Sequence, residues 1–125
     1  NILHCVSVPL WADTYHISEI KNDIEKSGTK QIIYIASDSS SNPQFSYYFS
    51  GLNLGWENKI FSYTKLDLKK DGIENVKIFL DSLKDKENIL IEKDGISRTK
   101  YDSTYLFMPS KFNFVMKTKG YELYR

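Results

Sequence analysis

The residues best suited to chemistry lie in one Ser-rich stretch, SDSSS at 37–41. Asp38 can accept hydrogen bonds from a sugar or ribose hydroxyl, and Ser39, Ser40 and Asn42 add small hydrogen-bonding groups. The stretch follows an apolar run and precedes a predicted helix, which is where open α/β sheets tend to bind ligands. Free backbone N–H groups and the helix dipole also favour an anion at such a point. We therefore predict a ligand-binding site at Asp38, Ser39, Ser40 and Asn42.

The same residues also have an ordinary structural role, because Ser, Asp and Asn are common in turns. Asn42 can cap the next helix, and Pro43 suits its first position. The stretch lacks the glycines of a phosphate-binding loop or a dinucleotide fingerprint, which weakens a nucleotide interpretation. A ligand site and a simple turn both stay open at this point.

The helix predicted over 42–52 carries adjacent aromatic residues. Four of its residues recur at helical spacing and form one apolar stripe: Phe45, Tyr48, Phe49 and Leu52. Tyr47 falls outside this stripe, so we place it near the surface, where it can stack on a sugar ring or a partner chain. Partial burial against a neighbouring loop is the alternative. Trp56, just past the helix, can take either role.

No pattern in the chain indicates catalysis or metal binding. His4 and His16 have no carboxylate or cysteine at ligand spacing, and Cys5 lies in an apolar run where burial raises the thiol pKa. The carboxylates are spread over helix faces and turns, where solvated charges usually lie. We expect no catalytic residue, no metal site and no cofactor.

Length and charge exclude several classes of protein. The chain has 125 residues, enough for one domain, and its 41% hydrophobic content supports a core. The net charge of +1 does not favour a nucleic-acid partner, because such proteins usually carry a strongly basic face. One cysteine rules out an internal disulfide, and no apolar run approaches the roughly 18 residues that span a membrane.

Hydrophobic periodicity predicts strands and helices in alternation. The predicted strands are at 2–10, 32–36, 59–64, 89–91, 112–116 and 121–125. A first amphipathic helix has Ile17, Ile20 and Ile24 on its apolar face, Asp13 or Ser18 as its cap, and Gly28 at its end. A second amphipathic helix over 72–84 has an apolar stripe of Ile73, Val76, Leu80 and Leu83, and it begins with a pattern similar to a capping box from Asp71 to Glu74. Residues 96–109 are ambiguous, with a short helix before Pro109 as one possibility.

This alternation predicts an α/β domain over residues 1–125. We expect a three-layer α/β/α arrangement with a mixed, mostly parallel sheet. The last two strands flank the Gly-containing segment 118–120 and predict a C-terminal β-hairpin.

Five segments together resemble a known family. They are EIKNDI at 19–24, IIYI at 32–35, YYF at 47–49, NILI at 88–91 and GYELY at 120–124. In these segments the chain resembles the soluble extracytoplasmic C-terminal domains of bacterial polytopic glycosyltransferases of the GT-C type. These enzymes are related to the protein mannosyltransferases and the aminoarabinose transferase. The resemblance covers about residues 17–125.

The resemblance implies that the domain belongs to a longer membrane protein at the extracytoplasmic face of the bacterial cell membrane. The parent would transfer a sugar from a polyprenyl-phosphate donor. The acidic catalytic residues of the family precede this domain, so none is carried onto this chain. The domain would then be non-catalytic and would bind the acceptor or act as a lid, with a sugar or lipid phosphate as ligand. The chain starts at Asn1 rather than Met, which agrees with an excised domain.

Two other functions stay open from the residues alone. The first is a free-standing small α/β domain that binds a phosphate or nucleotide through Asp38 and the serines. The second is a protein-interaction module that uses Tyr47 and Trp56. The sequence does not indicate an oligomeric state.

Overall fold

The computed structural model describes part of the chain, which is residues 16–29, 31–36, 45, 49, 62–84, 87–92 and 107–125. The strand predicted at 2–10 lies outside these residues. So does most of the ambiguous segment 96–109, of which only 107–109 are described. In the described part of the chain, none of the helices combines the length and apolar character that a membrane crossing requires.

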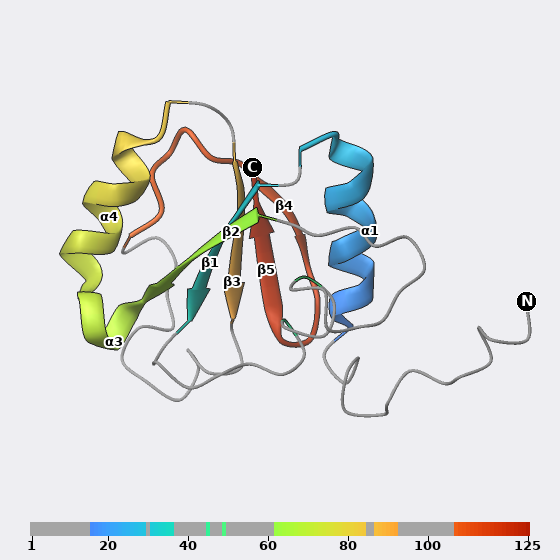
Figure 1. Ribbon diagram of the computed structural model, residues 1–125, viewed down its shortest axis with the longest axis horizontal. Helices are drawn as coiled ribbons and strands as arrows, with labels where there is room; N and C mark the ends of the chain where they lie inside the picture. The colour runs from blue at the N-terminus through green and yellow to red at the C-terminus, as the bar shows by residue number, and fades with distance from the viewer. Residues whose placement is uncertain are drawn as a thin grey trace, which may run out of the picture.

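The described elements form a mixed α/β structure, as predicted (Figure 1). In chain order they are α1 (Ile17–Ser27), β1 (Gln31–Ala36), β2 (Ser62–Asp67), α3 (Leu68–Asp71), α4 (Ile73–Ser82), β3 (Asn88–Glu92), β4 (Phe114–Lys117) and β5 (Tyr121–Tyr124). The strands form one sheet in the order β2-β1-β3-β5-β4. β1 pairs parallel with β2 and β3, whereas β5 pairs antiparallel with β3 and β4.

β1 is buried on both faces, as its apolar sequence predicts. All five residues from Ile32 to Ala36 are buried. Because successive strand residues point to opposite faces, they divide between two hydrophobic clusters. Ile32, Tyr34 and Ala36 belong to one cluster, and Ile33 and Ile35 belong to the other. A continuous apolar strand therefore indicates cover on both sides of the sheet here.

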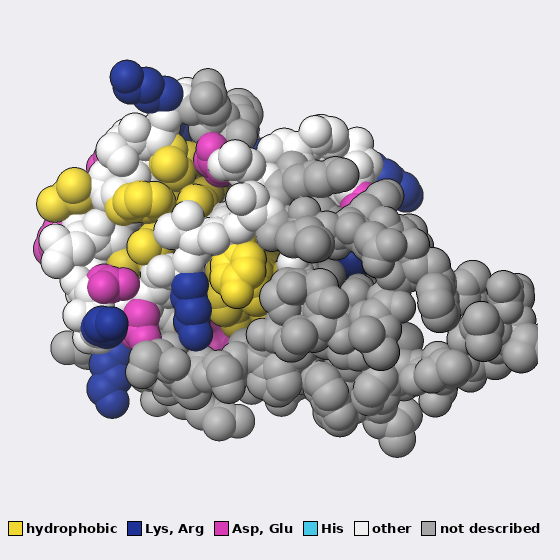
Figure 2. Space-filling model, in the orientation of Figure 1, with side chains coloured by type: hydrophobic (Ala, Val, Ile, Leu, Met, Phe, Trp, Pro, Cys, Tyr) yellow, Lys and Arg dark blue, Asp and Glu magenta, His cyan; other side chains and the backbone are white. Residues whose placement is uncertain are grey.

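One cluster, the α4-side cluster, joins the sheet to α4. Val76 and Leu80 of α4 are fully buried in it, and Ile73 and Leu83 pack at its border, which confirms the predicted apolar stripe. Outside this stripe, acidic and basic side chains are interspersed over α3 and α4 (Figure 2). The end of α4 is stabilised by Lys111, whose Nζ donates to the carbonyl oxygens of Asp81 at 2.9 Å and Leu83 at 2.5 Å.

The capping box predicted from Asp71 to Glu74 is wrong. The N-cap of α4 is Gly72, which has a φ of 85° and no side-chain cap. Asp71 instead accepts a hydrogen bond from the Asp67 N–H at 2.9 Å. The helical segment begins earlier than predicted, because α3 follows β2 directly. The Asp67 side chain accepts hydrogen bonds from the free N–H groups at the start of α3.

The bounds predicted for β2 are also wrong. The strand predicted at 59–64 is found at Ser62–Asp67, and 59–61 lie outside the described residues. Register with β1 explains the difference. β2 pairs along the whole of β1, from Gln31 opposite Ser62 to Ala36 opposite Asp67. This pairing also places Leu66 against the α4-side cluster. Pairing with β1 therefore decides where β2 ends. The loose alternation of apolar and polar residues in β2 does not predict this end.

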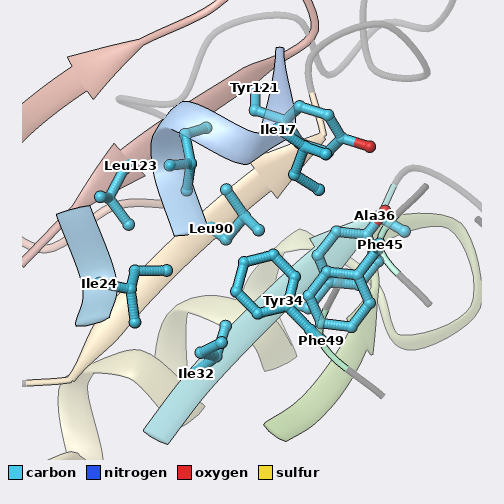
Figure 3. Close-up of a cluster of buried hydrophobic side chains, with 11 residues drawn as sticks. Ile17, Ile24, Ile32, Tyr34, Ala36, Phe45, Phe49, Leu90, Tyr121 and Leu123 are labelled. Atoms are coloured by element: carbon cyan, nitrogen blue, oxygen red, sulfur yellow. The ribbon is translucent and has the colours of Figure 1, made fainter. Parts of the chain in front are cut away.

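The other cluster, the α1-side cluster, joins the sheet to α1 (Figure 3). Ile17, Ile20 and Ile24 are each 0% exposed and pack in this cluster with Leu90 and Leu123, among others. The stripe predicted for the first helix is therefore confirmed.

Gly28 ends α1 in the left-handed region, at φ 85°, where a residue without a Cβ is least strained. The predicted start of α1 is wrong, because Ser18 lies inside the helix and the N-cap is His16, which makes no side-chain cap. The helix begins at Ile17, directly after His16, and the Ile17 side chain is fully buried. Asp13, the other predicted cap, lies outside the described residues.

Asn88 joins three parts of the chain at the start of β3. Its side chain is 0% exposed, and its Nδ2 donates to the carbonyl oxygens of Thr29 at 3.3 Å and Gln31 at 3.2 Å. Its Oδ1 accepts from Arg125 Nε at 2.7 Å, and the same guanidinium contacts Asp23 Oδ2 at 2.6 Å. Asn88 therefore links β3 to Thr29, to the first residue of β1 and to Arg125.

We expect Asn88→Leu to lower the free energy of unfolding by about 2 kcal/mol, because it removes the hydrogen bonds that this buried amide makes to Thr29, Gln31 and Arg125. Urea denaturation of the 125-residue chain measures this change. Asn22→Leu is the matched control, since Asn22 is exposed on α1 and its replacement should change stability by less than about 0.5 kcal/mol. Equal effects of the two substitutions would mean that the Asn88 contacts contribute nothing.

Candidate functional site

The predicted site residues Asp38, Ser39, Ser40, Asn42 and Tyr47 all lie outside the described residues. Their roles therefore stay predictions. Trp56 lies outside the described residues too. Of the helix predicted over 42–52, only two residues are described, and both are helical and buried. They are Phe45 and Phe49.

The structure describes the edge of the sheet from which the Ser-rich stretch leaves. β1 lies between β2 and β3, so its carboxyl end at Ala36 is inside the sheet rather than at its rim. The three strands are parallel, and they therefore end at the same edge, at Ala36, Asp67 and Glu92. The described part of β1 ends at this edge with Ala36.

The segments after β1 and β3 lead to opposite faces of the sheet. Phe45 and Phe49, which follow β1, belong to the α1-side cluster. Phe107 and Phe112, which follow β3, belong to the α4-side cluster. In α/β proteins, ligands tend to bind at the carboxyl ends of neighbouring parallel strands whose connections lead to opposite faces.

Asp67 has the most unusual environment at this edge. It is only 5% exposed. Its Oδ1 caps α3 by accepting from the N–H groups of Lys69 at 2.9 Å and Lys70 at 3.0 Å. Its Oδ2 is buried and has no hydrogen-bond partner among the described residues. A buried carboxylate oxygen without a donor is costly, so its presence here calls for an explanation beyond capping.

Sequence reasoning missed Asp67, because it ended the strand at 64. One signal was present: Asp67 directly precedes Leu68-Lys69-Lys70, and Asp before a helical segment is a common N-cap. That signal predicts the cap and not the buried oxygen, which depends on the pairing of β2 with β1.

A second carboxylate at the edge is held by a buried tyrosine. The Tyr34 hydroxyl donates to Glu92 Oε2 at 2.9 Å. The Tyr34 ring is 1% exposed and stacks on Phe45, with ring centres 4.0 Å apart and planes inclined by 13°. Phe45 in turn stacks on Phe49 at 4.9 Å (Figure 3). This rigid aromatic stack fixes the position of the hydroxyl that contacts Glu92.

Tyr63 adds an aromatic ring to the same side of β2. Because side chains alternate along a strand, Tyr63 and Asp67 point to the same face. The Tyr63 ring is 43% exposed and lies edge-on to Phe45, with centres 4.8 Å apart and planes at 83°. Tyr63 lies near the start of β2, about 13 Å along the strand from Asp67. Sequence reasoning did not single out Tyr63.

The described residues include no group of three or more His, Cys, Asp and Glu side chains suited to hold a metal ion. His16 lies 3.4 Å from Glu19 at the exposed start of α1.

Comparison with family models, curated proteins and solved structures finds no match for this chain. Any function must therefore be argued from the site itself.

We expect Asp67→Asn to leave the free energy of unfolding unchanged or to raise it, because Asn also caps helices and carries no buried charge. Asp67→Ala should lower that energy by about 1 kcal/mol, because it removes the cap. Urea denaturation of both variants measures the difference. If Asp67→Asn destabilises the chain as much as Asp67→Ala, the carboxylate charge itself stabilises the fold.

Proposed function

We propose that this chain is a non-catalytic ligand-binding domain whose site lies at the carboxyl edge of the sheet. In this proposal it is part of a bacterial membrane glycosyltransferase that uses a polyprenyl-phosphate sugar donor. It acts on the extracytoplasmic side, where it binds the sugar-bearing acceptor or covers the active site as a lid. The membrane parent rests on the sequence resemblance alone.

The buried, unpartnered Oδ2 of Asp67 carries the proposal of a ligand site. A hydroxyl group of a bound ligand would supply the missing donor, and hydrogen bonds to a charged acceptor are the stronger kind. The predicted residues Asp38, Ser39, Ser40 and Asn42 follow Ala36, the direct pairing partner of Asp67. In this proposal they supply further groups of the same chemistry.

The charge of the described edge favours a neutral hydroxyl-bearing ligand over a phosphate. Asp67, Asp71 and Glu92 place three carboxylates at the ends of β2, α3 and β3, and α3 adds the two ammonium groups of Lys69 and Lys70, so the edge is negative by one charge. Carboxylates accept hydrogen bonds from sugar hydroxyls but repel a phosphate, which is also an anion. The sugar is therefore preferred to the phosphate or nucleotide of the alternative hypothesis.

We also propose the finer architecture that the sequence predicts for the whole chain: three layers, a mostly parallel sheet, and a C-terminal hairpin. Two observations support the layers and the hairpin, whereas the pairings of the described strands are two parallel and two antiparallel. The α1-side and α4-side clusters lie on opposite faces of β1. β4 and β5 pair antiparallel, and the Thr118 N–H donates to the Tyr121 carbonyl oxygen at 2.9 Å.

Titration of the isotope-labelled chain with methyl α-mannoside, and separately with inorganic phosphate, tests the proposed site by NMR. We expect the glycoside to shift the amide signals of Ala36, Asp67 and Glu92. Asp67→Asn should weaken binding by roughly tenfold or more, because it removes the charged acceptor. Asp81→Asn is the matched control, since it removes one carboxylate from the exposed surface of α4.

Shifts of the same signals by phosphate alone would contradict the sugar site and support the phosphate-binding alternative. An equal loss of glycoside affinity in the Asp67 and Asp81 variants would show that binding depends on the net charge of the chain and not on the Asp67 oxygen.

A further inference from the structure

The two edges of the described sheet differ in how well they are protected. β2 forms one edge and β4 forms the other. β4 has only four residues, and a change of register between Phe114 and Met116 places Phe114 and Lys117 on the same face. Short strands, bulges and lysines are the features that keep an edge from pairing with another strand. β4 is therefore a protected edge.

β2 is a longer and more regular edge than β4. It pairs with β1 in continuous register through all six of its residues, from Ser62 to Asp67. The first four of these residues, 62–65, are all exposed. Because successive side chains point to opposite faces, this end of β2 is exposed on both faces. In Figure 1, β2 crosses in front of β1, and the atoms along its path in Figure 2 belong to described residues. The outer edge of β2 therefore lies at the surface.

The chemistry of this edge selects the kind of partner that fits it. An edge strand presents a row of N–H and C=O groups on the side away from its neighbour. Among the described strands, β1 is the one that pairs with β2. An extended strand is the structure that can pair with such a row along its length. The partner of this edge is therefore a β-strand.

We infer that β2 pairs antiparallel with β2 of a second copy of this chain, about a two-fold axis at Thr64. In such an isologous contact, the same surface of both copies takes part. The axis is perpendicular to the joined sheet, so each face of one copy continues as the same face of the other. Residues of the same face must then lie opposite each other. The axis therefore passes through a residue of β2 and not between two residues.

Charge and register favour Thr64 over the other central residues. An axis at Lys65 would place two like charges directly opposite each other, which destabilises a sheet. An axis at Leu66 would use Asp67, which is buried and already caps α3. An axis at Tyr63 would pair only the described residues 62–64. An axis at Thr64 pairs the whole of 62–66 and leaves Asp67 outside the contact.

The side chains that meet in this register are favourable pairs. Thr64 lies opposite the partner's Thr64, and threonine pairs stabilise antiparallel strands. Tyr63 lies opposite the partner's Lys65, so an aromatic ring meets a lysine on each side of the axis. The 43% exposed Tyr63 ring would lose contact with water there. The contact therefore contains no pair of like charges.

The expected dimer is weak. Five paired residues on each copy are far fewer than the roughly 20–30 residues a side of a standard interface. Two five-stranded sheets joined in this way reach about ten strands, which is within the usual size of open sheets. The test therefore needs protein concentrations up to about 1 mM, where weak complexes form.

Analytical ultracentrifugation of the 125-residue chain, from about 10 μM to about 1 mM, measures the association. We expect a monomer–dimer equilibrium, and slower amide exchange at alternate residues of 62–66 as the concentration rises. Thr64→Lys should weaken the dimer about fivefold or more, because two like charges then lie opposite each other at the axis. Ser110→Lys is the matched control, since it adds the same charge at an exposed position outside the sheet.

A second variant tests the position of the axis directly. Thr64→Glu alone should also weaken the dimer, for the same reason as Thr64→Lys. An equimolar mixture of the two variants should form a heterodimer, because opposite charges then lie opposite each other. Association of the mixture also shows that both variants are folded.

The inference is overturned if the chain stays monomeric up to about 1 mM. In such a monomer, amides of 62–66 that are protected at every concentration would mean that another segment of the same chain covers this edge. It is also overturned if the mixture does not associate, or if Ser110→Lys weakens the dimer as much as Thr64→Lys. The dimer does not depend on the proposed sugar site, and glycoside binding at Asp67 can succeed or fail independently.

Discussion

The structure depends on the burial of β1 on both of its faces. A strand with five consecutive buried residues needs apolar cover above and below the sheet. α1 supplies this cover on one side through three isoleucines, and α4 supplies it on the other through Val76 and Leu80. Each such side chain contributes about 1.5–3 kcal/mol when it leaves water, so this arrangement accounts for much of the core. The neighbouring strands and the two clusters all follow from this requirement.

Burial of both faces also confines polar chemistry to the ends of the strands. Tyr34 illustrates this: its ring lies in the core, and its hydroxyl reaches the sheet edge, where it contacts Glu92. Asp67 lies at the same edge. One of its carboxylate oxygens caps α3, and the other has no hydrogen-bond partner among the described residues. Residues at functional sites often carry such a local cost, which the rest of the fold must offset.

Local patterns predicted the elements that form the core. The spacing of Ile17, Ile20 and Ile24 predicted α1, and the apolar runs at 32–36 and 89–91 predicted the two strands at the centre of the sheet. These predictions succeeded because the buried faces of helices and strands require apolar residues at characteristic spacings in the sequence. Caps and strand ends were predicted less well. At Asp67 and Asp71, several residues can satisfy the same N–H groups, and tertiary contacts select among them.

The sequence by itself determined the α/β class and the apolar faces of α1, α4 and β1, because these depend on residues close together in the chain. Only the tertiary structure decided the order β2-β1-β3-β5-β4, the register of β2, and the meeting of Tyr34 with Glu92, which are 58 residues apart. It also decided that Phe114 and Lys117 share a face, through a change of register on β4. Strand order and register arise from contacts between distant segments, and no local pattern of residues encodes them.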